Sequence, residues 1–332
     1  MKGIVLSVGL ALVCGAASAQ PCPGNPAALG VSRELTVSAA DYPLLGRMQY
    51  RQTLPLADRE VVLTFDDGPL PPYSDRVLDI LKAECVKATF FLVGRQARAN
   101  PAAVRRIYRA GHTVGTHSEN HPLRQMSGQR AEREIDGGIG SIAAALGDAK
   151  ALAPFFRVPG LLRSPSIEAL AKSRALVVWS SDTLADDWRR ISSEQVLRLA
   201  LSRLERKGRG VLLLHDIQPR TVLMLPTLLT ELKRRGFKIV HVVPQGERPV
   251  LPEAPVMVAS ASNEAWPRVI ATAPRTTAGS SSEAVTDTAA PVADALVSEV
   301  PLPPVRPVRH AAIKPSAKPK TVIAMRDLHA VE

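Results

Sequence analysis

Two short runs of this chain hold side chains that can bind a metal ion and move protons. Asp66 and Asp67 are adjacent, and His117 and His121 follow about fifty residues later, four positions apart. Imidazole and carboxylate groups are common ligands of Zn²⁺, and a second carboxylate beside the ion could act as a general base. The two runs therefore indicate the chemistry of a metal-dependent hydrolase.

The residues before the two aspartates predict a strand that ends there. Residues 60–65 are mostly β-branched or apolar, and the Gly68-Pro69 pair that follows cannot continue a sheet. Because successive strand residues point to opposite sides, Asp66 and Asp67 can do different jobs, one on a metal ion and one beside it.

The spacing of the two histidines puts both imidazoles on one face if their segment is helical, as two ligands of one ion require. A zincin peptidase would carry Glu directly after the first histidine, and this chain has Ser118 there. The pattern therefore disfavours a zincin peptidase.

Three more polar clusters follow apolar, strand-like runs further along the chain, at residues 155–160, 182–188 and 211–216. Taken singly, such clusters are usually turns, solvated faces or satisfied buried histidines. Five clusters at successive strand ends instead favour one shared site, because active sites of (β/α) folds lie at the carboxyl ends of the strands.

With these motifs the sequence resembles the polysaccharide deacetylases, the NodB-homology domain of carbohydrate esterase family 4, over residues 59–243. The first, second and fifth of the family's five motifs match closely. The resemblance implies that Asp66 is the general base, that Asp67, His117 and His121 are the metal ligands, and that His215 is the general acid. It also implies that Arg157 orients the base, that Asp187 adjusts the acidity of the general acid, and that Trp188 forms part of the pocket wall.

Two motifs depart from the family pattern. The third motif usually has an aromatic residue between proline and glycine, and its backbone N–H helps to hold the oxyanion; here Pro159 is followed directly by Gly160. The oxyanion donor is therefore unassigned, and Gly160 is expected only to contact substrate. In the fourth motif the family's single aspartate position could correspond to Asp182, Asp186 or Asp187, and we predict Asp187.

The same residues suit amide hydrolysis on chemical grounds. A Zn²⁺-like ion held by two His and one Asp can lower the pKa of its water from 15.7 to roughly 7. Asp66 could take the remaining proton of that water, and His215 could protonate the departing amine. We expect Zn²⁺, with Co²⁺ or Ni²⁺ as alternatives.

Strand-like and helix-like stretches alternate around these motifs. Strands are expected over 61–65, 88–93, 112–116, 154–157, 176–180, 211–214 and 237–243, and amphipathic helices over 74–83, 101–110, 129–146, 164–173, 193–206 and 221–235. This alternation predicts an α/β fold with a parallel sheet of about seven strands, either an incomplete (β/α) barrel or a doubly wound open sheet. The family resemblance implies the distorted barrel of the NodB-homology fold.

The N-terminus predicts secretion. Lys2 precedes an apolar run over 4–13 and then Ala17-Ser18-Ala19, so residues 1–19 are interpreted as a signal peptide cleaved before Gln20. The apolar run is too short to span a bilayer, so no transmembrane helix is expected after cleavage. Cys22 and Cys85 then remain in an oxidising compartment, secreted or periplasmic, where we expect a disulfide.

The remaining boundaries follow from composition. Residues 20–58 are interpreted as an N-terminal extension, 59–246 as the catalytic domain, and 247–332, rich in Pro, Ala and Ser without periodicity, as a disordered tail. The formal net charge is +11; loss of Lys2 leaves +10, and because the tail is neutral overall this charge belongs to 20–246. Such a basic domain suits an anionic envelope surface, while a leader and the lack of a nucleic-acid-binding motif argue against nucleic acid.

Three functions remain open at this point. The first is a secreted metal-dependent N-deacetylase of a glycan that contains N-acetylglucosamine: peptidoglycan, chitin oligomers or an exopolysaccharide. The second is a hydrolase of another C–N amide or imide bond, which secretion disfavours. The third is a non-catalytic glycan-binding protein, which the intact set of acidic and histidine residues disfavours.

Overall fold

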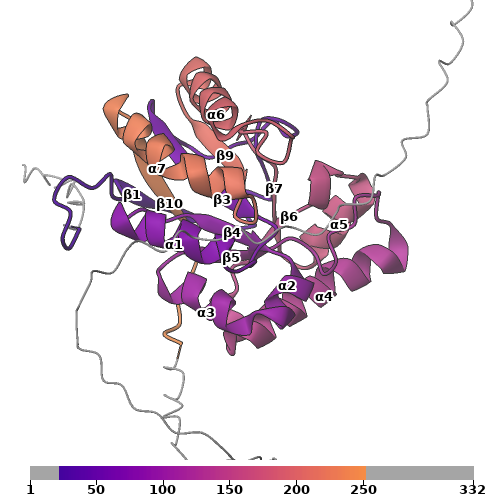
Figure 1. Cartoon of the computed structure of the whole chain (residues 1–332). Helices are drawn as coiled ribbons and strands as arrows, with labels where there is room; N and C mark the ends of the chain where they lie inside the picture. The colour runs from indigo at the N-terminus through magenta and orange to yellow at the C-terminus, as the bar shows by residue number, and fades with distance from the viewer. Residues whose placement is uncertain (1–21, 252–332) are drawn as a thin grey trace, which may run out of the picture. The chain divides into compact units, whose positions relative to one another are not determined.

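Parallel strands and outer helices make up the described part of the chain, residues 22–251, in a computed structural model (Figure 1). The strands are β1 (Arg33–Val37), β2 (Leu44–Leu45), β3 (Glu60–Asp66), β4 (Thr89–Leu92), β5 (Thr113–Thr116), β6 (Phe155–Arg157), β7 (Val177–Trp179), β8 (Thr183–Leu184), β9 (Gly210–His215) and β10 (Lys238–Pro244). The α-helices are α1 (Tyr73–Ala83), α2 (Gly94–Ala99), α3 (Pro101–Arg109), α4 (Gly128–Leu146), α5 (Pro165–Ser173), α6 (Ser193–Lys207) and α7 (Pro219–Arg234).

Eight of the ten strands form one row in the order β8-β9-β3-β4-β5-β6-β7-β2, and every pairing in it is parallel. From β3 to β7 each strand lies beside its predecessor in the chain, as in a (β/α) barrel; a doubly wound sheet would reverse direction. Among residues 22–251 no pairing joins β2 to β8, so the barrel stays open on that side. The predicted α/β fold with an incomplete barrel is confirmed.

Strand β3 is where the sheet branches, because it pairs with β4, β9 and β10. All seven of its residues are buried, as expected of a parallel strand covered on both faces. Its residue Val61 pairs with both β9 and β10, and Phe65 pairs with both β9 and β4. Since β9 occupies one edge, β10 and β4 share the other edge, at the start and the end of β3 respectively.

Helices cover the outside of the row through apolar stripes. In Figure 1, α6 and α7 lie together on one side, while α2, α3 and α4 gather on another. Helix α6 begins with a capping box between Ser192 and Gln195 and ends at Gly208, whose left-handed backbone (φ +72°) closes the last turn. Such local signals explain why all seven predicted strands and all six predicted helices are present, with shifts of one or two residues at most ends.

The segment before residue 59, predicted as an N-terminal extension, contributes two strands to the sheet. Strand β1 pairs with β10, and the two-residue β2 pairs with β7, so this segment joins the sheet at two places. Strands β1, β2 and β8 and helix α2 lie outside the sequence prediction. All four of these elements have six residues or fewer and no periodicity long enough to identify them from pattern alone.

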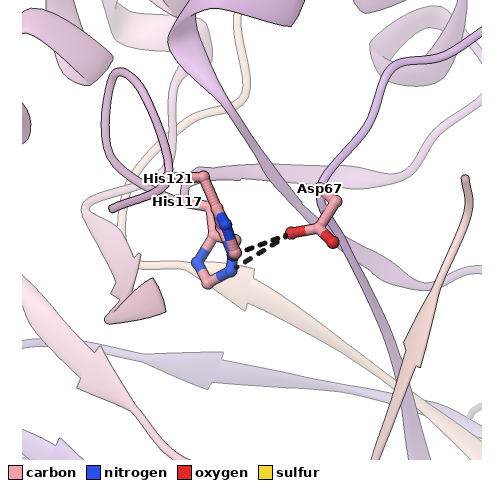
Figure 2. A group of neighbouring side chains, drawn as sticks. All are labelled: Asp67, His117 and His121. Carbon is pink, nitrogen blue, oxygen red and sulfur yellow. Dashed lines mark ion pairs between the residues drawn. The ribbon is translucent and has the colours of Figure 1, made fainter. Parts of the chain in front are cut away.

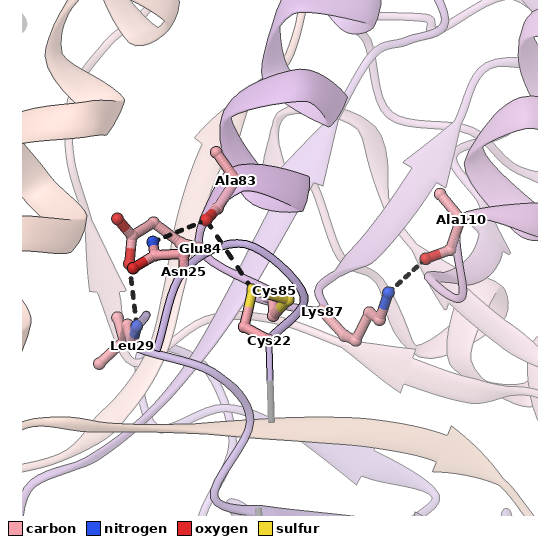
Figure 3. Close-up of a disulfide and its surroundings, with 8 residues drawn as sticks. All are labelled: Cys22, Asn25, Leu29, Ala83, Glu84, Cys85, Lys87 and Ala110. Carbon is pink, nitrogen blue, oxygen red and sulfur yellow. Dashed lines mark hydrogen bonds between the residues drawn. A yellow bond between two sulfur atoms is a disulfide. The ribbon is translucent and has the colours of Figure 1, made fainter. Parts of the chain in front are cut away.

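A disulfide ties the first described residues to the end of α1. Cys22 is bonded to Cys85, and beside it the Asn25 side-chain amide donates to the Ala83 carbonyl (2.9 Å) (Figure 3). The Leu29 N–H donates to the Glu84 carboxylate (2.8 Å). The bridge expected from the two cysteines is thus present, and hydrogen bonds hold the same segment in place.

Residues 247–251, which composition assigns to the tail, pack against α3 and β5. The Arg248 guanidinium stacks over the Tyr108 ring at 4.1 Å and donates to the carbonyl oxygens of Gly111 (3.1 Å) and His112 (2.8 Å). Leu251 is buried in the main core. The packed region therefore extends at least through Leu251, five residues beyond the expected boundary at Gly246.

Two predicted segments lie outside the described residues: the signal peptide over 1–19 and the tail from residue 252 onward. Within residues 22–251 no helix has the length and apolar character needed to cross a membrane.

Candidate active site

The motif residues converge because they sit at the carboxyl ends of neighbouring strands. Asp66 ends β3, Arg157 ends β6 and His215 ends β9, and Asp66 and His215 are direct partners in the β3–β9 ladder. These ends open into a cavity of about 480 Å³. Its lining residues are Asp66, Asp67, His117, His121, Leu123, Val158, Gly160, Leu161, Leu184, Trp188, Leu213 and His215.

Asp67, His117 and His121 face one another across this cavity (Figure 2). The Nε2 atoms of His117 and His121 lie 3.5 and 3.2 Å from Asp67 Oδ1, and one ligand atom from each residue falls within 4.8 Å of the others. Asp67 Oδ1 is buried and has no hydrogen-bond partner among residues 22–251. A buried acceptor without a donor, facing two imidazole nitrogens, fits a divalent cation.

The two histidines do not lie on a helix, the condition under which their spacing alone would put both rings on one face. They lie on a loop after β5, where Ser118 (φ +67°) and His121 (φ +55°) adopt left-handed backbone conformations. The Ser118 hydroxyl accepts a hydrogen bond from the His121 N–H (3.1 Å) and closes the turn. A tight turn thus brings the rings together, with centroids 4.9 Å apart.

His117 is held in the state that a metal ligand needs. Its Nδ1 bonds to the Arg157 carbonyl oxygen (2.7 Å), which requires the proton on Nδ1 and leaves the Nε2 lone pair directed to the cavity. Burial lowers the pKa of His117 to about 3, so the ring is neutral at physiological pH.

Asp66 is buried beside a buried guanidinium. Arg157 donates to Asp66 Oδ1 (2.6 Å), to the Thr64 hydroxyl (2.9 Å) and to the Ser180 carbonyl (3.0 Å), and its charge lies 4.2 Å from the Phe91 ring centroid. Burial raises the pKa of Asp66, and the Arg157 charge opposes that rise. The carboxylate is therefore more basic than an exposed aspartate while its orientation is set by Arg157.

His215 forms a second polar group beside the metal residues. Its Nδ1 bonds to Asp187 Oδ1 (2.7 Å), and Asp187 Oδ2 accepts from the His215 N–H (2.7 Å) and the Thr221 hydroxyl (2.5 Å). Burial acts to lower the pKa of His215, but the Asp187 charge and hydrogen bond outweigh it and raise the pKa to about 9. The free Nε2 lies 3.9 Å from Asp67 Oδ2, facing the same site.

The structure separates the three aspartates that the sequence left in competition. Asp187 contacts His215, as chosen. Asp186 pairs with Arg203 (3.0 Å), whose hydrogen bond lowers the pKa of that carboxyl group. Asp182 lies near the start of β9, where its Oδ2 accepts from the Val211 N–H (2.8 Å). Only Asp187 reaches the cavity residues.

The shortened third motif forms a single 3₁₀ turn, Pro159–Leu161, at the cavity rim. Gly160 (φ +59°) lines the cavity, as expected of a substrate contact. The Leu161 N–H already donates to the Val158 carbonyl (2.9 Å), so it is not free to hold an oxyanion.

Sequence patterns did not identify three residues of this site. Thr64 accepts a hydrogen bond from Arg157, Thr221 donates one to Asp187, and Leu123 lines the cavity rim. Each lies in an ordinary strand, helix or loop, so periodicity alone explains its residue type. In contrast, Trp188, flagged from the fourth motif, stands at the rim with 45% of its surface exposed and its ring edge-on to His215.

Comparisons with known proteins agree with this arrangement. The family described as "Polysaccharide deacetylase" matches residues 54–179. A peptidoglycan-N-acetylglucosamine deacetylase of Listeria monocytogenes is 33% identical over 187 residues, which cover 56% of this chain and 38% of that protein. The chain thus spans well under half of that relative's length. A chitooligosaccharide deacetylase of Sinorhizobium fredii is 32% identical over 218 residues, covering 60% of this chain and 98% of that protein.

Among solved structures, a peptidoglycan deacetylase of Bdellovibrio bacteriovorus is similar, with a TM-score of 0.59 and 32% identity over 65% of this chain and 60% of that chain. The fold, the motif residues at the strand ends and these relatives agree, and the chain belongs to the polysaccharide deacetylase family.

Proposed function

We propose that this chain is a secreted, metal-dependent N-deacetylase that removes acetyl groups from a glycan containing N-acetylglucosamine. One observation carries the proposal: a buried carboxylate, Asp66, and a protonated imidazole, His215, flank the Asp67, His117 and His121 group in one cavity. This arrangement provides a base, an acid and a cation site within reach of one acyl group.

Asp67, His117 and His121 would hold the metal ion. Two nitrogens and one oxygen suit Zn²⁺ best, with Co²⁺ and Ni²⁺ as alternatives. When bound, such an ion would activate a water molecule and polarise the acyl oxygen of the substrate.

The protein's own residues would move the protons. Asp66 accepts a proton from the attacking water as its oxygen bonds to the acyl carbon, and Arg157 keeps that carboxylate ionised and aimed. As the C–N bond breaks, His215 donates its Nε2 proton to the nitrogen, and Asp187 stabilises the imidazolium before transfer. Acetate and a free amino sugar result.

The names of the relatives and the residues at the rim of the catalytic cavity support this substrate class. The relatives named above act, by their names, on peptidoglycan N-acetylglucosamine and on chitooligosaccharides. Trp188 at the rim, 45% exposed, offers an apolar ring face of the kind that packs against sugars. The signal-like N-terminus and the Cys22–Cys85 bridge support an oxidising, extracytoplasmic compartment, and the basic domain suits an anionic envelope.

The deciding experiment measures acetate release from peptidoglycan, chitin oligomers and acetylated xylan, with and without chelator. Release from an N-acetylated glycan that stops with chelator and returns with Zn²⁺ or Co²⁺ supports the proposal. Release only from a non-sugar amide would favour the second hydrolase class, and glycan binding without any release would favour the non-catalytic one.

Two variants test the roles within the site. His121→Ala is expected to lose both metal and activity, because it removes a ligand. Asp66→Asn is expected to keep the metal and lose about 10²- to 10⁴-fold in kcat, because only proton transfer is removed. Metal content by atomic emission checks both; loss of metal in Asp66→Asn, with retention in Asp67→Asn, would reverse the two aspartate roles.

A further inference from the structure

A second, larger cavity lies on the open side of the barrel. Its volume is about 650 Å³, and it shares no lining residue with the catalytic cavity. It is bounded on one side by the segment after β2, residues 47–56, and on the other by Asp182, the end of α6 and Gly210 at the start of β9. Gly210 and His215 stand at opposite ends of β9, about 17 Å apart along an extended strand.

Four cations converge on this cavity: Arg47, Arg51, Lys207 and Arg209. All four are exposed, and none forms an ion pair within the described range 22–251. Lys207 and Arg209 donate only to backbone carbonyls, those of Asp182 and Leu56 (2.7 Å for the latter). A carbonyl orients a cation but does not cancel its charge, so the cavity keeps its positive field.

The one acidic residue of the cavity, Asp182, offsets at most one of these four charges. Asp182 Oδ1 accepts from the Arg47 backbone N–H (2.8 Å) and the Thr53 hydroxyl (3.0 Å), while Oδ2 accepts from Thr53 (2.9 Å) and from Val211 N–H (2.8 Å). Its carboxylate is buried and occupied by neutral donors. Asp182 therefore binds three chain segments together and builds a rigid floor beneath the cations.

The close approach of these segments depends on glycine. A side chain at Gly46 would meet the Ser181 backbone nitrogen at 2.6 Å, and one at Gly210 would meet the Asp182 Cβ at 2.8 Å. Both glycines also have left-handed φ values, +106° and +145°. The cavity is thus a built feature of the fold, which holds four cationic side chains near a single buried carboxylate.

We propose that this cavity binds an oligoanion bearing several carboxylate or phosphate groups. The three arginines present planar forks that match these groups in bidentate geometry. A cavity of about 650 Å³ lies within the range of sites for ligands of oligosaccharide or metabolite size and exceeds what one small oxyanion fills. An anion there would offset the mutual repulsion of the four cations. The site does not depend on the deacetylase activity proposed above.

The test is calorimetric titration of the mature chain at 150 mM NaCl with two probes that bind metals weakly: trigalacturonate for carboxylates and myo-inositol hexasulfate for compact oxyanions. At least one probe should bind with a Kd below 1 mM. Arg47→Gln/Arg51→Gln should weaken binding at least tenfold, and this variant should fold, since neither side chain has a hydrogen bond within residues 22–251. Lys207→Gln is the second variant and should weaken binding in the same direction.

The matched control is Arg130→Gln/Arg133→Gln on α4, two exposed arginines away from both cavities. This variant loses the same charge and should bind within twofold of the wild type. Equal weakening in both double variants would mean general attraction by a basic surface and would overturn the site. The site would also be overturned if both probes failed to bind, or if neutral chitotetraose displaced them. None of these outcomes bears on acetate release, which tests the proposed function separately.

Discussion

At the scale of single residues, the site is organised around two ion pairs, Arg157 with Asp66 and Asp187 with His215. The Arg157 guanidinium contacts Asp66 at 2.6 Å, and the Asp187 carboxylate contacts His215 at 2.7 Å. Arg157 opposes the burial that raises the pKa of Asp66, whereas Asp187 raises the pKa of His215 to about 9 and keeps the imidazole protonated. Because the titratable groups of the cavity interact, they titrate as one coupled system, and a pH profile reports apparent pKa values of the whole group.

Removing the Asp187 charge should move the basic limb of the pH profile. Since Asp187 raises the pKa of His215, to about 9 in the native site, Asp187→Asn should lower that pKa and let burial dominate. The basic limb of kcat/KM is then expected at lower pH, with a reduced kcat. A basic limb that does not move would mean that another group, and not His215, supplies the proton.

Replacing His215 itself separates acid catalysis from metal binding. His215→Ala should lower kcat on a sugar amide by about 10²- to 10⁴-fold and leave metal content unchanged. An aryl acetate, whose leaving group needs no proton, should lose much less. Equal losses on both substrates, or an empty metal site, would show that His215 acts as a ligand or an electrostatic support.

At the scale of elements, the turn from α3 into β5 carries a buried neutral histidine. His112 is buried, accepts from the Ala88 N–H (3.2 Å) and is faced by Lys87, His241 and Arg248. Burial, with these cationic neighbours, lowers the pKa of His112 well below its usual 6.5. The folded state therefore disfavours the proton that the unfolded chain accepts.

The free energy of unfolding should therefore decrease at acidic pH because of His112, which lies just before β5 and the metal histidines. A depressed folded pKa contributes stability above roughly pH 6.5 that is lost as the pH falls below it, by up to about 1.4 kcal/mol per pH unit. His112→Gln cannot take up this proton, so the stability difference between wild type and variant should shrink from pH 7.5 to pH 5. Denaturant unfolding at several pH values measures it; a constant difference would contradict the assignment.

At the scale of the whole molecule, the packed region extends through Leu251. A chain truncated after Leu251 should fold and keep its activity. Truncation after Gly246 should lower the free energy of unfolding by about 3 kcal/mol, because it removes a buried leucine and the Arg248 contacts with Tyr108 and Gly111. Thermal and urea unfolding of the two truncated chains checks this. Equal stability would show that residues 247–251 contribute nothing to the fold.

The alternation of strands and helices and the residues at the strand ends can be predicted from the amino-acid sequence. Apolar periodicity is a local property, and Asp66, Asp67, His117, His121 and His215 stand where that pattern breaks. The order of β3 to β7 follows from the same pattern, because a parallel strand after each helix packs beside its predecessor.

Which side chains contact one another depends on the tertiary structure. Asp182, Asp186 and Asp187 lie within six residues, yet they contact Thr53, Arg203 and His215 respectively, and no local pattern distinguishes them. The short strands β1 and β2 and the cationic cavity beside them likewise depend on pairing between distant segments. Periodicity reports which face of an element is buried, whereas contacts between residues far apart in the chain are set by how the elements pack.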